Sequence, residues 1–454
     1  MGSWTLSPTA GTNSLTATSG TLTGSPVSFT ATGTAGAATK LALTTAPSTS
    51  AQSGVAFAQQ PVVQLQDANS NPVSQSNTVV TATVASGPTG ATLTNATATT
   101  AGTGAATFSG LAINGSVGGY TLSFSSGTLT SVTPGTITLS AGAAASITAN
   151  SATTQSATAG SAVGAPPSVI VKDANGNPVA NVAVTFAVTA GGGTVNPTTP
   201  VSTNASGIAT ATSWTLGTVA GANGLTASSG TLTGSPVTFT ATATAGPASA
   251  SQSTVAAAPG TITASSGSSA TTLTVTVKDA FGNPVSGATV TLAASGTGNT
   301  LTQPVGTTNA SGQITGTLSS TVAAAKTVTA TANGTTITQT ASVTVTPGAA
   351  AVLAFTVQPS TTKMNSPITP AVVVTGRDAF GNTATAFAGA VTVSITSGTG
   401  TPLAVLSGTN PVNAVAGVAT FSNLSINLTG LGYRLDAAAG GVTGTTSNTF
   451  DITL

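Results

Sequence analysis

Short runs of strictly alternating apolar and polar residues recur along the whole chain. In "SPVTFTATATAG" (residues 235–246), Val237, Phe239 and the alanines take one side, while threonines take the other. "VAVTFAV" (residues 182–188) alternates in the same way, with valines and a phenylalanine on one side. A period of two is typical of a half-buried β-strand. Turn-forming Gly, Pro, Asn and Ser separate these runs, so the pattern predicts an all-β protein.

A nonapeptide repeats four times at long intervals. It reads "LQDANSNPV" (65–73), "VKDANGNPV" (171–179), "VKDAFGNPV" (277–285) and "GRDAFGNTA" (376–384). Its aspartates are Asp67, Asp173, Asp279 and Asp378, which are 106, 106 and 99 residues apart. This period is too long for a solenoid coil and fits one β-sandwich of about 100 residues.

Short Gly-Ala and Gly-Pro-Ala runs close one repeat and open the next, which divides the chain into five ranges. We expect a partial immunoglobulin-like domain of last strands only at 1–36, and complete domains at 37–142, 143–246, 247–349 and 350–454. The linkers between them are only a few residues long. Short linkers limit the freedom of neighbouring domains, so we expect tandem sandwiches in an elongated rod.

The nonapeptide has the composition of a strand that runs into a tight turn. Alternation places Asp173 in register with Val169 and Val171, on the inward face at the rim of the core. From there its carboxylate can accept N–H groups of the turn as an Asx-type cap. Glycine and asparagine supply the positive φ that the turn needs, and proline fixes its exit. The predicted structural turn residues are Asp67, Asp173, Asp279, Asp378, Gly176, Asn177, Pro178, Gly282, Asn283, Pro284, Gly381 and Asn382.

A calcium loop is the alternative interpretation of this motif. Asp173, Asn175 and Asn177 resemble the first ligands of such a loop, but the chain has no Glu to act as the later bidentate ligand. In two repeats the middle position is Phe281 or Phe380, which cannot coordinate a cation. We therefore expect no metal site.

Composition argues against catalysis and against most other ligand classes. The chain of 454 residues has no His, no Cys, no Glu and six Asp, so the usual acid–base and nucleophilic arrangements are missing. Zinc ligation by Cys or His is excluded for the same reason. The seven cations are scattered rather than clustered, so no nucleic-acid surface is expected. No apolar run approaches 18 residues, so we expect no membrane insertion, and no cofactor is indicated.

The second and third repeats carry a family resemblance. "VKDANGNPVANVAVTF" followed by "TNASGIATAT" is similar to the bacterial immunoglobulin-like domains of the invasin and intimin type. The matching positions are Asp173, Gly176, Asn177, Pro178 and Gly207, and Asp279, Gly282, Asn283, Pro284 and Gly312. The first and fourth repeats depart from it, with Ser70 in place of the glycine and Thr383 in place of the proline. The resemblance implies extracellular stalks or spacers that hold a binding tip away from the cell.

The first 36 residues nearly duplicate the end of the second repeat. "SWTLSPTAGTNSLTATSGTLTGSPVSFTATGTAG" (3–36) matches residues 213–246 at a constant offset of 210. Trp4 and Trp214 are equivalent, and we expect both to fill cores. The copy at 3–36 lacks the partner strands that precede 213–246, so an apolar row with Val27 and Phe29 would be exposed. Either the chain is a window of a longer repeating polypeptide, or another chain completes this sandwich.

Three functions remain open at this stage. The first is a non-catalytic stalk or spacer of an extracellular bacterial surface protein, or a subunit of an extracellular fibre. The second is an adhesive module that binds glycan or a host protein through loops at the sandwich ends. The third is the non-catalytic part of a secreted enzyme. The partner expected from the strand edges and the partial domain is another copy of the chain; the ligand is unknown.

Overall fold

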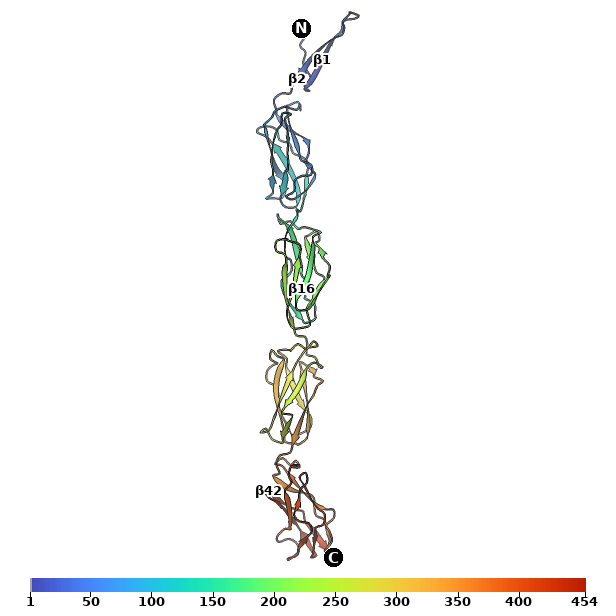
Figure 1. Ribbon diagram of the computed structural model, residues 1–454, viewed down its shortest axis with the longest axis vertical. Coiled ribbons are helices and arrows are strands. Elements are labelled where there is room, and N and C mark those ends of the chain that lie inside the picture. Colours follow the sequence, from blue (N-terminus) through green and yellow to red (C-terminus); the bar gives the residue numbers. More distant parts are fainter. Residues whose placement is uncertain (1) are drawn as a thin grey trace. The chain divides into compact units, whose positions relative to one another are not determined.

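The computed structural model describes residues 2–454, and every regular element in that range is a β-strand. This confirms the predicted all-β class (Figure 1). No helix in the described range is long and apolar enough to cross a membrane. The chain packs into two compact units, Met1–Thr244 and Ala245–Leu454.

The first unit opens with an isolated hairpin. Strand β1 (Gly11–Ala17) pairs antiparallel with β2 (Val27–Gly33), and these two strands form a sheet of their own. Leu15 and Phe29 face each other across the hairpin, and both side chains are about half exposed. The hairpin therefore has an apolar face without a core beneath it.

The first repeat is a sandwich whose two main sheets have the orders β4-β12-β11-β6-β8 and β3-β5-β9, with β10-β7 beside them. Its first edge strand, β4, runs parallel to the last strand, β12, while the other pairings are antiparallel. The strands are β3 (Lys40–Thr45), β4 (Ser50–Gln52), β5 (Val62–Gln66), β6 (Val79–Ser86), β7 (Thr92–Thr94), β8 (Thr97–Thr99), β9 (Ala105–Thr107), β10 (Ala112–Asn114), β11 (Gly118–Ser125) and β12 (Ile137–Ser140).

The second repeat has the same strand order as the first. Its sheets are β14-β22-β21-β16-β18, β13-β15-β19 and β17-β20, so each strand takes the place of the one ten numbers earlier. The strands are β13 (Ala144–Ala149), β14 (Thr154–Thr158), β15 (Ser168–Asp173), β16 (Ala183–Ala190), β17 (Thr194–Asn196), β18 (Val201–Ser202), β19 (Ile208–Thr210), β20 (Ser213–Thr215), β21 (Gly221–Ser228) and β22 (Val237–Thr244).

In the second unit, the third repeat keeps this plan with one strand fewer. The single strand β28 occupies the place of the two short strands β19 and β20. The sheets of the third repeat have the orders β23-β25-β28-β27 and β24-β31-β29-β26, with β30 beside β29. The strands are β23 (Thr254–Ala258), β24 (Thr261–Thr263), β25 (Thr271–Thr276), β26 (Val290–Ala294), β27 (Asn299–Thr302), β28 (Gln313–Ser320), β29 (Ala325–Ala332), β30 (Thr335–Thr336) and β31 (Ala341–Thr346).

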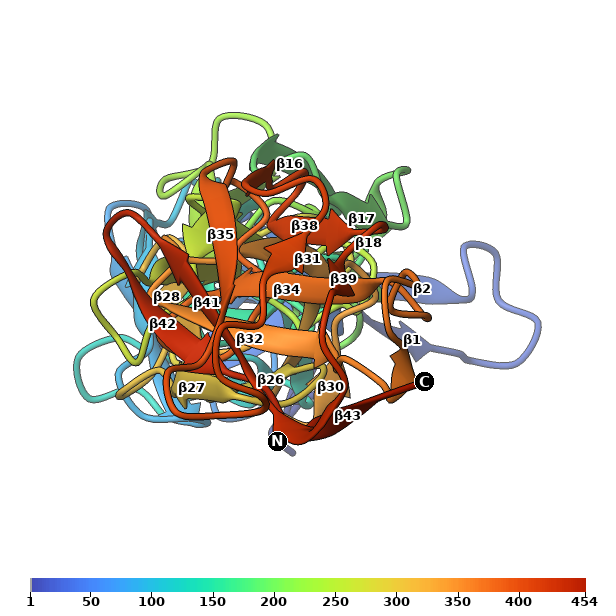
Figure 2. The same ribbon diagram turned by 90° about the horizontal axis from the view of Figure 1, so that it is seen from below.

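The fourth repeat joins its sheets more closely. Strand β42 pairs with both β41 and β32, which produces the order β37-β35-β41-β42-β32-β34-β38 (Figure 2). The sheets β33-β43-β40 and β36-β39 complete it. The strands are β32 (Val352–Val357), β33 (Thr362–Lys363), β34 (Val372–Arg377), β35 (Ala390–Ile395), β36 (Leu406–Ser407), β37 (Val412–Asn413), β38 (Val418–Phe421), β39 (Ser425–Ile426), β40 (Gly430–Tyr433), β41 (Leu435–Ala439), β42 (Val442–Thr446) and β43 (Phe450–Thr453).

Each of the four sandwiches has its own hydrophobic core, and alternation places the core residues as predicted. In β22, Phe239 and its apolar neighbours Ala241 and Ala243 are buried while the intervening threonines are exposed. The five sequence ranges remain our proposed division of the chain.

The expectation that both tryptophans fill cores holds only for Trp214. Trp214 is fully buried, whereas 38% of Trp4 is exposed. The physical reason is that β20 places Trp214 opposite Val195 of β17, whereas within residues 2–454 no strand pairs with the segment around Trp4.

The two copies of the hairpin sequence provide a matched test of burial. Phe239→Ala removes a ring buried in the second core, so the free energy of unfolding of the second repeat should fall by about 3–5 kcal/mol. The equivalent Phe29→Ala removes a half-exposed ring and should change it by less than about 0.5 kcal/mol. The stability of the second repeat in each variant is measured by denaturant unfolding, with the fluorescence of buried Trp214 as the signal. Equal losses in the two variants would contradict this assignment of the cores.

Candidate functional site

The four motif aspartates each lie at the end of an inward row of a strand. Asp173 is the last residue of β15, after buried Val169 and Val171. Asp67 and Asp378 directly follow their strands, and Asp279 lies three residues after the end of β25. All four side chains are only 1–4% exposed. A buried carboxylate is stable only when hydrogen bonds replace its water, so its partners decide what the site does.

One carboxylate oxygen caps the turn. Oδ1 of Asp173 accepts the N–H groups of Asn175, at 2.9 Å, and Asn177, at 2.8 Å. The same two positions donate to Asp67, Asp279 and Asp378 at 2.8–2.9 Å. Between them the backbone has positive φ at Gly176, Gly282 and Gly381, and also at Ser70 (φ 70°), which stands where the other repeats have glycine. The turn therefore keeps its shape despite that substitution.

The second carboxylate oxygen binds outside the turn backbone. Oδ2 of Asp173 accepts the N–H of Gly142, at 2.8 Å, from the linker that enters the repeat. It also accepts the side-chain amide of Asn177, at 2.8 Å. Linker glycines Gly36, Gly246 and Gly348 donate in the same way to the other three aspartates, at 2.9–3.0 Å. Each carboxylate therefore fastens its own turn to the linker in front of it.

The asparagine four residues after the aspartate extends this network into the preceding segment. Besides donating to Asp173, Nδ2 of Asn177 donates to the carbonyl of Gly115, and its Oδ1 accepts the N–H of Val117. Both of those groups belong to the loop before β11 of the first repeat. The side-chain amide of Asn177 therefore binds two backbone groups of the first repeat, the carbonyl of Gly115 and the N–H of Val117.

The same bridge recurs at two other junctions within the two units. Asn71 donates to the carbonyl of Pro8 at 2.9 Å and accepts the N–H of Ala10 at 2.7 Å. Asn382 donates to the carbonyl of Thr321 at 2.8 Å and accepts the N–H of Ala323 at 2.9 Å. We call the aspartate, the asparagine and the linker glycine of each repeat its junction triad. The three bridges share one geometry, although the residues that they contact differ.

Proline and a distant glycine complete the turn. Pro178 pairs with Lys172 in an isolated β-bridge, as Pro284 does with Lys278. Gly207 packs over this bridge with φ 71°, and a Cβ there would lie 2.7 Å from the carbonyl oxygen of Val171. This close approach explains why the strand–turn motif is followed about 30 residues later by a glycine.

The hydrogen bonds outweigh burial in setting the charge of the aspartates. For Asp173, Asp279 and Asp378, burial raises the pKa, but the asparagine amide and three backbone N–H groups together lower it below its usual value. For Asp67 the amide of Asn71 has the largest effect, and the pKa falls to about 2. All four therefore carry a negative charge at neutral pH.

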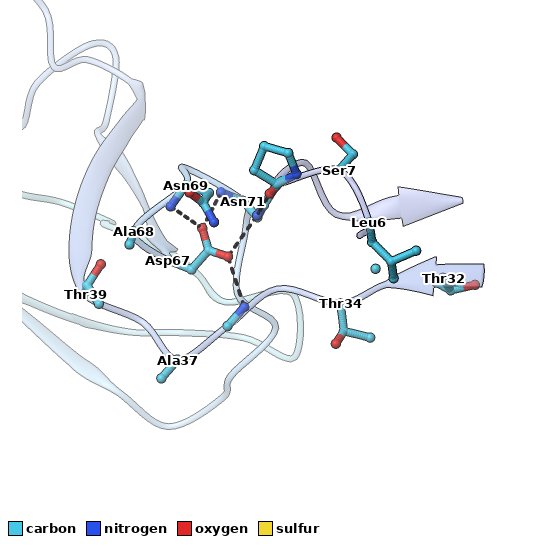
Figure 3. A pocket seen from close by; sticks show the side chains of 13 residues that line it. Leu6, Ser7, Thr32, Thr34, Ala37, Thr39, Asp67, Ala68, Asn69 and Asn71 are labelled. Carbon is cyan, nitrogen blue, oxygen red and sulfur yellow. Dashed lines mark hydrogen bonds between the residues drawn. The ribbon is translucent and has the colours of Figure 1, made fainter. Parts of the chain in front are cut away.

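A solvent-open hollow of about 640 Å³ lies beside Asp67, between the start of the hairpin and the first repeat. Figure 3 shows that the Asp67 carboxylate points to the amide of Asn71 and the backbone of its own turn. In the described residues no three Asp, Glu, His or Cys side chains gather as metal ligands. The carboxylate already accepts four hydrogen bonds, and its neighbouring asparagine presents N–H groups rather than oxygens. This geometry favours the structural interpretation over the calcium loop.

Sequence reasoning located the aspartates but missed what their second oxygen and the asparagine bind. The signal was present, because a linker glycine precedes every motif aspartate by 30 to 33 residues, as Gly142 precedes Asp173. An asparagine also follows each aspartate by four residues, even where proline is lost at Thr383. Alternation alone cannot reveal contacts between repeats, because it describes only one strand at a time.

Removing one carboxylate should destabilise its repeat. Asp173→Ala leaves two turn N–H groups and the Gly142 N–H without their acceptor, which should cost about 1–3 kcal/mol of unfolding free energy. Trp214 fluorescence during denaturation of the full chain follows the second repeat. Asp436→Ala is the control, since Asp436 lies in the fourth repeat and accepts only the Thr446 hydroxyl among the described contacts. Unchanged stability of Asp173→Ala would contradict the cap, and destabilisation of the wild type by EDTA would restore the calcium interpretation.

Acid should weaken the second repeat through one group, because Asp173 is the only carboxyl between residues 143 and 246. Its pKa is lower in the folded chain than the value of about 3.9 expected when unfolded. The unfolded state therefore binds more protons at low pH. We expect a constant free energy of unfolding between pH 5 and 8, and a loss as the pH falls below about 4. Asp173→Asn should remove that loss; an equally acid-sensitive Asp173→Asn variant would contradict the assignment.

The chain resembles one protein family and several solved structures. The family described as "Invasin, domain 3" matches residues 249–348, while no curated protein matches the chain. Among solved structures, the Escherichia coli adhesin FdeC is 24% identical with a TM-score of 0.40 and covers 68% of this chain and 96% of its own. Invasin, titled a bacterial integrin-binding protein, is 17% identical with a TM-score of 0.41, and the match covers 91% of this chain and 79% of the invasin chain. InvD of Yersinia pseudotuberculosis is 22% identical with a TM-score of 0.39, and the match covers 67% of this chain and 96% of the InvD chain.

The family match falls on the third repeat, one of the two repeats whose motif carried the resemblance. It covers the segment with Asp279, Asn283 and Gly312. Invasin-type domains are non-enzymatic and belong to extracellular or cell-surface proteins, which agrees with the class and location expected from the sequence. The match covers 100 of the 454 residues, and over them it confirms the resemblance to invasin-type immunoglobulin-like domains.

Proposed function

We propose that the chain is a non-catalytic spacer of an extracellular bacterial surface protein or fibre, in which the junction triads of Asn71, Asn177 and Asn382 hold neighbouring segments within each unit in a fixed orientation. The observation that carries this proposal is the amide bridge of Asn71, Asn177 and Asn382. Each amide binds its own aspartate and two backbone groups of the preceding segment. A spacer must resist bending at its junctions, and directional hydrogen bonds on both sides of a short linker supply that resistance.

The junctions are also insensitive to ordinary changes in the surroundings. The aspartates stay charged well below neutral pH, and their partners are amides and backbone N–H groups rather than lysines or arginines. Neutral donors in a buried site are weakly screened by salt, unlike exposed ion pairs. A spacer outside the cell benefits from joints that do not depend on pH or ionic strength.

The stiffness of one junction can be measured directly. Spin labels on cysteines introduced at exposed Thr138 and Thr148 flank the linker between the first two repeats, ten residues and therefore at most about 35 Å apart. We expect a narrow distance distribution in the wild type and a broader one in Asn177→Ala, measured by pulsed electron spin resonance. Asn204→Ala is the matched control, because Asn204 caps a turn inside the second repeat. A distribution unchanged in Asn177→Ala would contradict the proposal.

One observation favours the adhesive alternative. In the fourth repeat Leu403 has φ 71°, a rare conformation for a bulky residue, and its side chain is 92% exposed. Leu431, in β40, is 80% exposed, and the loop of Leu403 is tied to the residue before β40, because Thr401 donates to the carbonyl of Thr429. A strained loop with exposed apolar residues on it and beside it is typical of a binding surface. Beads coated with the Leu403→Ser, Leu431→Ser variant should then lose attachment to host-cell monolayers; equal attachment by wild type and variant would contradict this role.

A further inference from the structure

The hairpin β1–β2 is a copy of two strands whose complete surroundings are visible elsewhere in the chain. Residues 3–36 and 213–246 agree at 26 of 34 positions; the eight differences are Ser7/Gly217, Pro8/Thr218, Thr9/Val219, Thr12/Ala222, Ser14/Gly224, Thr18/Ser228, Ser28/Thr238 and Gly33/Ala243. The strand register is also the same. Leu15 pairs with Phe29 as Leu225 pairs with Phe239, and Gly11 pairs with Gly33 as Gly221 pairs with Ala243.

The local contacts within the two copies agree as well. The N–H of Ser7 donates to Oδ1 of Asn13 at 2.8 Å, and the N–H of Gly217 donates to Oδ1 of Asn223 at 2.9 Å. The hairpin therefore already has the conformation that it has inside a complete sandwich. Binding partner strands would require little rearrangement of its backbone.

The surroundings of the two copies differ completely. In the second repeat β22 pairs in parallel with β14, and β21 pairs antiparallel with β16. In the described part of the chain, β1 and β2 pair only with each other. As a result Leu15 is 45% exposed where Leu225 is 0%, and Phe29 is 51% exposed where Phe239 is 1%. Both outer edges of the hairpin and its apolar face lack the strands that cover their equivalents.

We propose that the hairpin β1–β2 is the binding site for a polypeptide segment equivalent to residues 143–212, which completes a fifth sandwich with it. The occupant is defined by its strands. One strand equivalent to β14 adds in parallel to the outer edge of β2, and one equivalent to β16 adds antiparallel to the outer edge of β1. Strand addition supplies the backbone hydrogen bonds, and the apolar row of the second strand covers Leu15 and Phe29.

Two of the eight differences define the occupant more closely. Ser14 stands where Gly224 lies, and a Cβ there would come within 2.8 Å of Oγ1 of Thr189. Ser7 stands where Gly217 lies, and a Cβ there would overlap the carbonyl oxygen of Gly191. Both contacts involve the end of β16 and the turn after it, residues 191–193, which consists of three glycines. The partner therefore needs a turn there that leaves room for two serine side chains.

Cross-linking tests the strand register, because the chain has no cysteine of its own. The probe is a polypeptide of residues 143–212 with Thr154→Cys, added to the full chain with Thr30→Cys. Thr240, the equivalent of Thr30, pairs directly with Thr154 in the second repeat. We expect a disulfide between probe and chain, and at least tenfold less with Thr32→Cys, whose equivalent, Thr242, pairs with Ser156.

A second chain carries Ser7→Gly and Ser14→Gly together with Thr30→Cys, which removes both overlaps with this probe. A register-specific disulfide in either chain supports the proposal, and its absence in both overturns it. Disulfides that join two Thr30→Cys chains equally well with and without probe would mean that hairpins pair with one another. That result also overturns the proposal.

A covalent version avoids aggregation of the open half-sandwich. Residues 143–212 are fused directly in front of Ser3 of the full chain, in the order that they have in front of Ser213. We expect the amides of β1 and β2 to exchange with solvent at least about a hundredfold more slowly than in the unfused chain. Phe29→Asp should abolish this protection, whereas Ser28→Asp should retain it, because the equivalent Thr238 is exposed. Unprotected hairpin amides in the fusion, with and without Ser7→Gly and Ser14→Gly, would overturn the proposal.

Discussion

The hydrogen bonds of one buried aspartate carboxylate hold each sandwich to the segment in front of it. In the second repeat the Asp173 carboxylate accepts four of them. Its first oxygen holds the turn after the strand, and its second holds the linker glycine and the amide of the asparagine. Burial alone would favour the neutral acid, which would lose acceptor capacity on one oxygen. The four donors reverse this preference and keep the charge in place. Fold and junction are therefore stabilised by the same group.

The coupling explains why a chain with only 13 charged residues places an aspartate at the same point of every repeat. An apolar core, mainly of Ala, Val, Leu and Ile, stabilises each sandwich, but apolar burial is non-directional and cannot fix the orientation of one repeat against the next. Hydrogen bonds from Asn177 to Gly115 and Val117 have that direction. The linker sequence can then vary, provided that one N–H reaches the carboxylate.

Sequence reasoning predicted the all-β class and the inward position of the aspartates, because a period of two directly reports which side of a strand is buried. It did not predict that the amide of Asn177 binds across a junction, since that contact joins residues about 60 positions apart. It also assigned Trp4 to a core by analogy with Trp214. The analogy fails because burial depends on partner strands, and the sequence around Trp4 cannot supply them. The equal strand orders of the first and second repeats were likewise hidden by their different motifs.

The Asp173 carboxylate couples the turn, the linker and the preceding repeat. Hydrogen exchange of single amides in the full chain measures this coupling when the wild type is compared with Asp173→Ala. We expect faster exchange at Asn175 in the turn, at Gly142 in the linker and at Val117 in the preceding repeat, which is linked to Asp173 through Asn177. Faster exchange confined to the turn, with Gly142 and Val117 unchanged, would contradict the claim.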